Sequence, residues 1–292
     1  MLRLAVVAWP LSSYNPRRLG EEIRSRGCVV VPVDARAFSS ARIAGKLEAC
    51  VSGSPLRVDG VVHVMSTDFP DGLSALANLG PTVPYLNSAA ACLRSADKYN
   101  TYLALRAAGV PTPRTRRCAD DRELLAAGET FGWPLVVKQA DGSGGQEVGL
   151  ATDADDLHRQ LPQLRRRGHE LLAQEYVGTS RGTDLRIVVI GGRVTAAGRR
   201  VSAGDFRSNL AQGGHGENAV PSPEEAAVAV AATAAAGLDI AGVDILTGPH
   251  GPLVLETNSF PGLYDIEPLT GINVTGAIIE LLIRRCRSTA AT

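Results

Sequence analysis

The stretch GLDIAGVDILTGPHGPLVLETNSFPG, residues 237–262, decides how the chain folds around its polar motifs. With a period of two residues it predicts short strands over residues 242–246 and 252–258. The intervening TGPHG is rich in residues that favour turns, so the two strands are expected to pair as a hairpin. This hairpin carries three polar side chains on an otherwise apolar frame.

Asp244 lies in the first predicted strand, and Glu256 and Asn258 end the second. Residues two apart on a strand share a face, and a hairpin can bring Asp244 beside the other pair. Carboxylates with no cation close in sequence are costly on an apolar scaffold, and a hard cation removes that cost. Carboxylate and amide oxygens suit Mg²⁺ or Mn²⁺, so a metal site is predicted. A surface hairpin whose acids face water is the alternative that these residues leave open.

The composition is that of an ordinary globular protein. The chain has 292 residues, 45% of them hydrophobic and 21% charged, which favours about two or three domains. A formal net charge of 0 indicates no nucleic-acid partner and no acidic membrane surface. No apolar run reaches the roughly 18 residues of a membrane span, and the N-terminus reads as a strand rather than a signal peptide. Five scattered cysteines form no disulfide or zinc motif, so a cytoplasmic location is expected.

The N-terminal region alternates apolar strands with helices. Strands are expected over residues 2–8, 29–33 and 58–65, and helices over residues 17–26 and 70–79. Near-continuous apolar strands of this kind form a small parallel sheet. No G-x-G-x-x-G follows the first strand, so dinucleotide binding is not indicated there.

Two lysines stand out because nearly all the other basic residues are arginine. Lys98 lies in the first turn of a helix expected over residues 95–109 with Ser95 as its cap, where a cation opposes the helix dipole. Lys138 lies in a strand expected over residues 135–139 and precedes a glycine-rich loop, an arrangement suited to binding phosphate. A solvated lysine and a flexible turn are the alternatives. The loop contains Gly142, Ser143, Gly144 and Gly145.

A strand expected over residues 170–177 ends in Glu175, Tyr176 and Val177. A nucleotide base can lie at such a strand end, and the Glu175 carboxylate can accept hydrogen bonds from a sugar. A strand-end carboxylate in water is the alternative.

Two glycines at 191–192 predict a second hairpin, between strands over residues 184–190 and 193–200. A basic run follows near the acidic hairpin in chain order, and arginine suits bidentate binding of carboxylate or phosphate. A solvated basic loop is the alternative. The run contains Arg199, Arg200 and Arg207. No role is assigned to Glu147, Arg186 and His215.

Three further helices are expected over residues 153–167, 222–237 and 274–285. The second has the clearest ends, because Ser222 and Glu225 form a capping box. Its interior of Ala and Val is almost free of charge, so it is expected to pack on a sheet.

The order of these motifs resembles that of the ATP-grasp superfamily, and most closely that of its RimK-like carboxylate–amine ligases. The resemblance covers roughly residues 92–285, and the region before it matches only the general pattern of a domain that precedes an ATP-grasp domain. The segments that carry it are Asp97-Lys98, Val136-Val137-Lys138, Gln174-Glu175-Tyr176-Val177, GDFRSN from Gly204, AGVDIL from Ala241 and GPLVLETNSFPG from Gly251.

The resemblance implies an α/β (α+β) ATP-grasp fold, with a small parallel-sheet domain over residues 1–90 and two ATP-clasping subdomains over 91–177 and 178–292. The implied ATP-binding residues are Lys98, Lys138, Gly142, Ser143, Gly144, Gly145, Glu175, Tyr176, Val177, Asp184 and Ser208. The implied ligands of Mg²⁺ or Mn²⁺ are Asp244, Glu256 and Asn258. The implied catalytic residues are Arg199, Arg200, Arg207 and Asn209.

The implied activity is ATP-dependent ligation of a carboxylate to an amine. A small-molecule or peptide carboxylate would attack ATP to form an acylphosphate, and an amino acid such as glutamate would then displace phosphate. Ser259-Phe260 departs from the family's usual residues and leaves the amine open. The alternatives are an amino-acid ligase of natural-product or peptide tailoring and a non-catalytic ATP-binding module. A homo-oligomer is left open.

Overall fold

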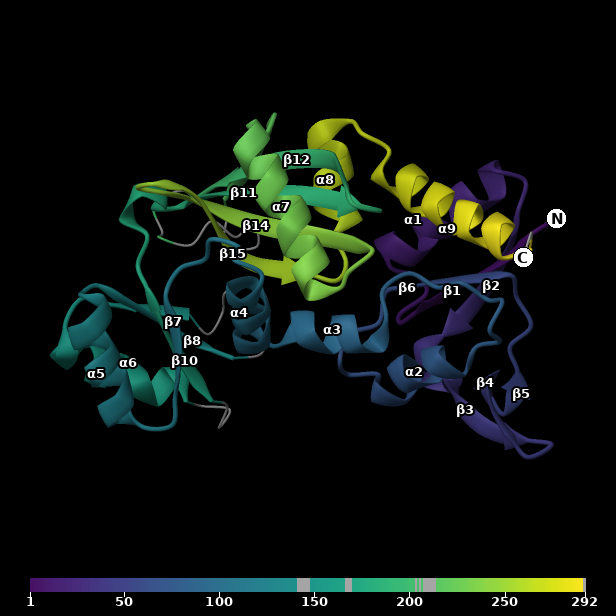
Figure 1. Cartoon of the computed structure of the whole chain (residues 1–292), viewed down its shortest axis with the longest axis horizontal. Coiled ribbons are helices and arrows are strands. Elements are labelled where there is room, and N and C mark those ends of the chain that lie inside the picture. Colours follow the sequence, from purple (N-terminus) through teal and green to yellow (C-terminus); the bar gives the residue numbers. More distant parts are fainter. Residues whose placement is uncertain (141–147, 166–169, 203, 205, 207–213, 291–292) are drawn as a thin grey trace.

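The computed structural model describes the chain except for residues 141–147, 166–169, 203, 205, 207–213 and 291–292. The molecule is elongated, and its elements lie in three groups along the long axis (Figure 1). The N-terminal sheets lie at one end, helices α5 and α6 at the other, and a larger sheet between them. Helices α3 and α4 run beneath that larger sheet, between the two ends.

The N-terminal region forms the parallel sheet that its apolar strands predict. The strands run in the order β2-β1-β6 and pair in parallel. A second, antiparallel sheet, with order β3-β4-β5, was not predicted. The elements are β1 (Arg3–Ala8), α1 (Tyr14–Ser25), β2 (Val29–Asp34), η1 (Ala35–Ala37), β3 (Phe38–Ile43), β4 (Lys46–Val51), β5 (Ser54–Pro55), β6 (Gly60–His63), α2 (Pro70–Ala75) and η2 (Leu76–Asn78).

The prediction of one helix over residues 95–109 is wrong about where that helix begins. The structure has two helices, α3 (Ala89–Ala96) and α4 (Lys98–Ala107), and Ser95 lies inside the first. Asp97 is the N-cap of α4, because its side chain accepts hydrogen bonds from two backbone N–H groups of the first turn. Asp97 adopts an extended conformation, with φ −95° and ψ 114°, and this ends α3.

A four-stranded antiparallel sheet follows, in the order β7-β10-β8-β9. Two helices cover it, and their apolar side chains join those of the strands in one core. The helix before β8 and the edge strands β7 and β9 were not predicted. The elements are β7 (Thr115–Cys118), α5 (Asp121–Phe131), β8 (Leu135–Gln139), β9 (Val148–Ala151), α6 (Ala154–Leu164), β10 (Leu171–Glu175) and η3 (Gly178–Ser180).

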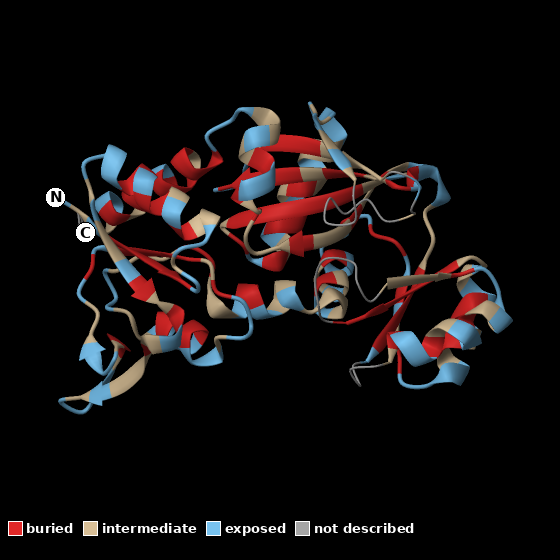
Figure 2. Cartoon of the chain, turned by 180° about the vertical axis from the view of Figure 1, so that it is seen from behind, coloured by how far each residue is buried: buried red, intermediate tan, exposed pale blue. Residues whose placement is uncertain are grey.

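The five-stranded antiparallel sheet lies at the centre of the molecule, in the order β13-β12-β11-β14-β15. Seen from behind, its strands are largely buried (Figure 2). Helix α7 packs on one face and α8 on the other. The capping box of Ser222 and Glu225 is confirmed, and Gly237 ends α7 with φ 73°. The elements are β11 (Thr183–Ile190), β12 (Arg193–Val201), β13 (His215–Asn218), α7 (Pro223–Ala236), β14 (Ile240–Gly248), β15 (Gly251–Asn258), α8 (Leu263–Thr270) and α9 (Val274–Ala290).

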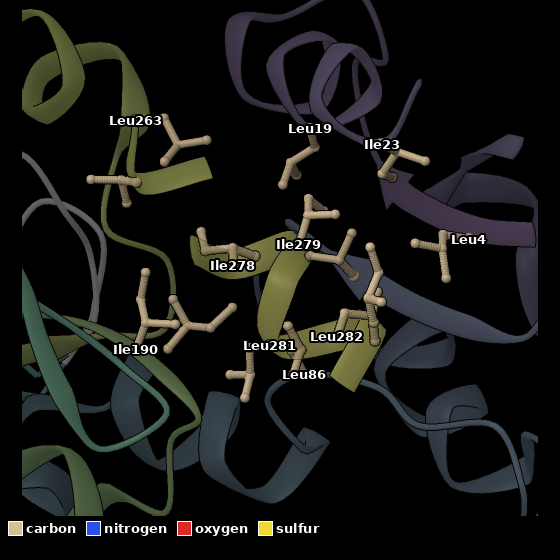
Figure 3. Packing of buried hydrophobic residues seen from close by; sticks show 14 of the residues in the cluster. Leu4, Leu19, Ile23, Leu86, Ile190, Leu263, Ile278, Ile279, Leu281 and Leu282 are labelled. Atoms are coloured by element: carbon tan, nitrogen blue, oxygen red, sulfur yellow. The ribbon is translucent and has the colours of Figure 1, made fainter. Parts of the chain in front are cut away.

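The C-terminal helix α9 joins the N-terminal sheet and the central sheet in one core. Its apolar side chains lie between α1 and β1 of the N-terminal sheet and β11 of the central sheet (Figure 3). The residues at this junction include Ile278, Ile279, Leu281 and Leu282 of α9, with Leu4, Leu19, Ile23 and Ile190 around them.

In the described part of the chain, no single helix is long and apolar enough to cross a membrane. The helices α8 and α9 pass that test only as a pair, and they are bent by 115° relative to each other.

Candidate functional site

The acidic hairpin is confirmed, and a β-bulge sets its register. From the turn inward the strands pair regularly as far as Ile245 opposite Val254, and Asp244 then pairs with Glu256. Leu255 is the extra residue of this bulge. The bulge turns Glu256 onto the α8 face of the sheet, whereas Val254 packs in the core beneath α7. Bulges of this kind re-aim side chains at functional sites.

The three predicted metal ligands therefore share one face. Asp244 lies opposite Glu256, and Asn258 lies opposite Gly242. The Nδ2 of Asn258 donates a hydrogen bond of 3.2 Å to the Oε1 of Glu256. No group of three or more His, Cys, Asp or Glu suited to a metal occurs among the described residues. The present set differs from such a group because one of its three members is an amide. Its oxygen donors fit a hard divalent cation.

Asp244 already has counter-ions inside the protein, contrary to the expectation of an uncompensated cluster. Arg186 lies opposite it on β11, with Nε 2.8 Å from Oδ1 and Nη2 2.8 Å from Oδ2. Arg200 of β12 places Nη2 2.9 Å from Oδ2 of the same carboxylate and also pairs with both oxygens of Asp184. These four residues form a network of two forked ion pairs bridged by Arg200, and we call it the arginine–aspartate network.

This network is buried, and its charges depend on one another. The side chains of Asp184 and Asp244 are only 2% and 3% exposed. Burial alone would raise the pKa of Asp244, but the charges and hydrogen bonds of Arg186 and Arg200 hold it below its usual range. Burial alone would lower the pKa of Arg200, and the two aspartates raise it instead. Asp244 is therefore ionised at neutral pH.

Lys138 reaches the same site from the four-stranded sheet. It is 5% exposed, and its Nζ donates a hydrogen bond of 3.0 Å to Oε1 of Gln174 on β10. Burial lowers its pKa to about 8, the Glu256 carboxylate opposes that shift, and the Lys98 ammonium adds to it. Glu256 and Lys98 therefore each lie within electrostatic reach of Lys138, although the three residues come from separate elements.

Lys98 is fixed by the backbone at the start of α4. Its N–H donates a hydrogen bond of 2.8 Å to the carbonyl of Ala140, directly after β8. The helix start and the end of the Lys138 strand are thus tied together. This contact gives a structural reason why both predicted lysines converge.

Glu175 ends β10 and pairs with Arg114 before β7. Its Oε1 accepts a hydrogen bond of 2.9 Å from the Arg114 N–H, and its Oε2 accepts one from the Arg114 side chain. Tyr176 and Val177 follow as half-buried residues that lead from this sheet towards β11. Contact with a nucleotide stays a prediction for all three predicted residues.

The structure separates the arginines that the sequence groups together. Arg200 belongs to the arginine–aspartate network, but Arg199 points to the opposite face, where its register partners are Leu185 and Glu217. Asp184, predicted beside the nucleotide, is held in the network by Arg200. Several predicted residues lie outside the described part of the chain: Gly142, Ser143, Gly144, Gly145, Arg207, Ser208 and Asn209.

Two residues of the site had no predicted role. Arg186 is the forked partner of Asp244, and the alternation of Asp184 with Arg186 on one strand is the signal that could have found it. Gln174 bridges Lys138 and the hydroxyl of Thr115 while only 5% exposed. It lies in the segment Gln174-Glu175-Tyr176-Val177 that carries the family resemblance, but only the residues after it were given a role.

This arrangement of sheets is the ATP-grasp fold. The structure is similar to ATP-grasp ligase PsnB complexed with minimal precursor, with a TM-score of 0.76, 21% identity and coverage of 96% of this chain and 98% of that chain. It is also similar to D-alanine–D-alanine ligase from Bacillus anthracis, with a TM-score of 0.70, 16% identity and coverage of 100% and 99%.

The chain belongs to the RimK-like ATP-grasp family, whose domain matches residues 95–282. It is 34% identical over 293 residues to a protein named probable alpha-L-glutamate ligase from Legionella pneumophila (strain Corby), a match that covers 98% of this chain and 97% of the relative. A relative of the same name from Klebsiella pneumoniae (strain 342) is 32% identical, with coverage of 97% and 96%. The chain is thus an enzyme, a ligase that forms carbon–nitrogen bonds.

Proposed function

We propose that this ligase joins a carboxylate to the amino group of an amino acid and cleaves ATP to ADP and phosphate. The observation that carries the proposal is the set of Asp244, Glu256 and Asn258 on one face of the hairpin, with the Lys138 ammonium acting on Glu256 from the four-stranded sheet. A cationic group and an oxygen-ligand set at one place suit the phosphates of a nucleotide and their metal ion. Structures of the similar ligase PsnB contain Mg and ADP, or AMPPNP.

The nucleotide would lie between the four-stranded and five-stranded sheets. Lys98 and Lys138 would neutralise its phosphates, and Glu175, Tyr176 and Val177 would bind its adenosine. Glu256 and Asn258 would hold Mg²⁺ or Mn²⁺ together with Asp244, and the ion would offset phosphate charge when bound. ATP binding is also proposed for the glycine-rich segment from Gly142 to Gly145 and for Ser208. Catalytic roles are proposed for Arg207 and Asn209.

The chain's residues favour activation by phosphoryl transfer. A carboxylate that attacks the γ-phosphorus becomes an acylphosphate, and the amine then forms the amide as phosphate leaves. Arginines can hold the substrate carboxylate and the charge that develops on it. We assign this role to Arg200 and Arg207. Arg199, on the opposite face of β12, is proposed for the same role from that face.

Glutamate is the amine that the family names favour. The relatives from Legionella and Klebsiella carry the name alpha-L-glutamate ligase at 34% and 32% identity over nearly the whole chain. We propose a small-molecule or peptide carboxylate as the second substrate. We further propose three units, over residues 1–90, 91–177 and 178–292, in a reducing, cytoplasmic setting that suits five unpaired cysteines.

The deciding experiment measures the products of the ATP reaction. The purified chain, with Mg²⁺, ATP, glutamate and a panel of carboxylates, should release ADP and phosphate only when the correct pair is present. Hydroxylamine in place of glutamate should trap the activated acid as a hydroxamate, which mass spectrometry identifies. AMP and pyrophosphate as products would exclude the acylphosphate route. ADP release that no amine stimulates would favour the non-catalytic module.

A further inference from the structure

Arg186 lies where a cation would serve both predicted carboxylate ligands. Its Nε and Nη2 each lie 2.8 Å from a different oxygen of Asp244. It also interacts electrostatically with Glu256, which lies opposite Asp244 on the neighbouring strand. The guanidinium thus supplies positive charge to both carboxylates, as a bound metal ion would, while its hydrogen bonds go to Asp244.

The oxygens of Asp244 are largely committed in this arrangement. Oδ1 accepts one hydrogen bond from Arg186, and Oδ2 accepts one from Arg186 and one from Arg200. A carboxylate offers about four lone-pair positions, so these contacts take three of them. A divalent cation and the Arg186 fork would therefore compete for the same oxygens, and like charges would also repel.

Arg200 differs from Arg186 in how firmly it is held. Arg200 has a second forked partner in Asp184, so loss of one contact to Asp244 leaves it paired. The forked contact of Arg186 is to Asp244 itself. Arg186 is therefore the arginine of the network that a cation at Asp244 would displace.

We propose that Arg186 is an exchangeable counter-ion of Asp244, which neutralises the carboxylate in the empty enzyme and gives way when a divalent cation binds with the nucleotide. This inference rests on the proposed metal site. The displaced guanidinium is then available to an anionic group beside that site, the substrate carboxylate or the phosphoryl group in transfer. Metal binding and the binding of an anionic substrate are thereby coupled through one side chain.

The proposal predicts the sign of a binding change. Calorimetric titration of Mn²⁺ in the presence of ADP should show affinity about tenfold tighter in Arg186→Gln than in the unsubstituted enzyme, because the competing charge is gone. Arg186→Lys keeps the charge and should stay within about twofold of the unsubstituted enzyme. Arg193→Gln removes an exposed arginine from the first position of β12, far along the same strand pair from Asp244, and should leave the affinity unchanged.

A weaker or equal Mn²⁺ affinity in Arg186→Gln would overturn the proposal, because Arg186 would then only orient Asp244. The thermal midpoint gives a second readout: Arg186→Gln should melt lower than the unsubstituted enzyme in EDTA and gain more from Mn²⁺ with ADP. If this variant does not fold, Arg186→Lys decides, and a marked rise in its affinity would contradict the proposal. Failure of the unsubstituted enzyme to bind Mn²⁺ with ADP would instead refute the metal site itself.

Discussion

The two carboxylates of the proposed metal site differ in how many hydrogen bonds they already accept from the protein. Among the described residues, Asp244 accepts three hydrogen bonds from arginines, whereas Glu256 accepts one from Asn258. Glu256 is also half-buried rather than buried, and Lys138 acts on it from the other sheet. Glu256 is therefore the side chain best placed to gain a cation.

We expect Glu256→Gln to keep its fold and to lose turnover by about 10²-fold or more, because one charged oxygen ligand is replaced by a neutral one. The measurement is Mg²⁺-dependent ATP consumption, with circular dichroism as the check on folding. Glu280→Gln, on the exposed side of α9, is the matched control and should be fully active. Undiminished ATP consumption in Glu256→Gln would refute its role as a ligand.

Lys138 should bind the nucleotide's phosphates through its ammonium. Lys138→Ala is expected to weaken ATP binding by about 1–3 kcal/mol, the value of a hydrogen bond to a charged group. Since its pKa lies at about 8, affinity should also fall as the pH rises above that value. Calorimetry at several pH values measures both effects. Lys46→Ala, an exposed lysine on β4, should change neither, and ATP affinity unchanged in Lys138→Ala would contradict the assignment.

The same lysine should make stability depend on pH. Its pKa falls from 10.5 to about 8 on folding, so between these values the unfolded chain holds a proton that the folded chain lacks. Burying the charged Lys138 therefore destabilises the folded state below pH 8. This penalty, about 3 kcal/mol in total, disappears as the pH rises towards 10.5. Urea unfolding should show Lys138→Met more stable than the unsubstituted chain below pH 8, with a difference that shrinks at higher pH. A constant difference would contradict the shift.

At the scale of elements, the break between α3 and α4 positions Lys98. Asp97 creates it, because its Oδ1 accepts hydrogen bonds of 2.8 Å from the Tyr99 N–H and 2.9 Å from the Asn100 N–H. Its Oδ2 also lies 2.9 Å from Nη2 of Arg117. One side chain thus caps α4 and ties it to β7.

Asp97→Ala should cost about 1–2 kcal/mol of unfolding free energy, the usual value of a lost N-cap. Asp97→Asn keeps an oxygen that can cap and loses only the ion pair, so it should cost less than about 1 kcal/mol. Urea denaturation of both variants gives the comparison. Equal losses would show that the ion pair with Arg117, rather than the cap, sets the stability of this junction.

At the scale of the whole molecule, Asn87 connects the N-terminal region with the acidic hairpin. Its Nδ2 donates to the carbonyls of Ile240 and Ser259 at 2.9 and 2.6 Å, and its Oδ1 accepts from the N–H groups of Asp239 and Ile240 at 2.7 and 3.0 Å. The residue is 2% exposed and has φ 64°, a conformation that asparagine tolerates. Asn87 and the α9 core together hold the N-terminal region against the central sheet.

Asn87→Ala should therefore destabilise the whole chain by about 3 kcal/mol or more, since buried backbone groups would lose their partners. Urea unfolding should remain a single transition with a lower midpoint, because the units are joined. Asn87→Gly adopts the positive φ without strain. The stability that this variant loses therefore measures the side-chain hydrogen bonds without the backbone strain that alanine would add. A loss under about 1 kcal/mol in Asn87→Gly would show that the side-chain contacts matter little.

The sequence by itself determined the apolar strands, the capping box of α7, the two lysines and the order of motifs that marks the family. These are local properties, since alternation, helix caps and turn residues act over a few positions. The same local reasoning missed the break at Asp97, because the preceding Ser95 is also a good cap residue. It also missed the small antiparallel sheet of β3, β4 and β5, whose pattern is weak.

Only the tertiary structure decided the geometry of the site. Regular alternation would have placed Glu256 on the same face as Val254, in the core, and the bulge at Leu255 places it opposite Asp244 instead. The pairing of Asp244 with Arg186 likewise depends on β11 lying beside β14, strands some fifty residues apart in the chain. Strand register and long-range charge pairing are set by which strands become neighbours, and no local pattern contains that information.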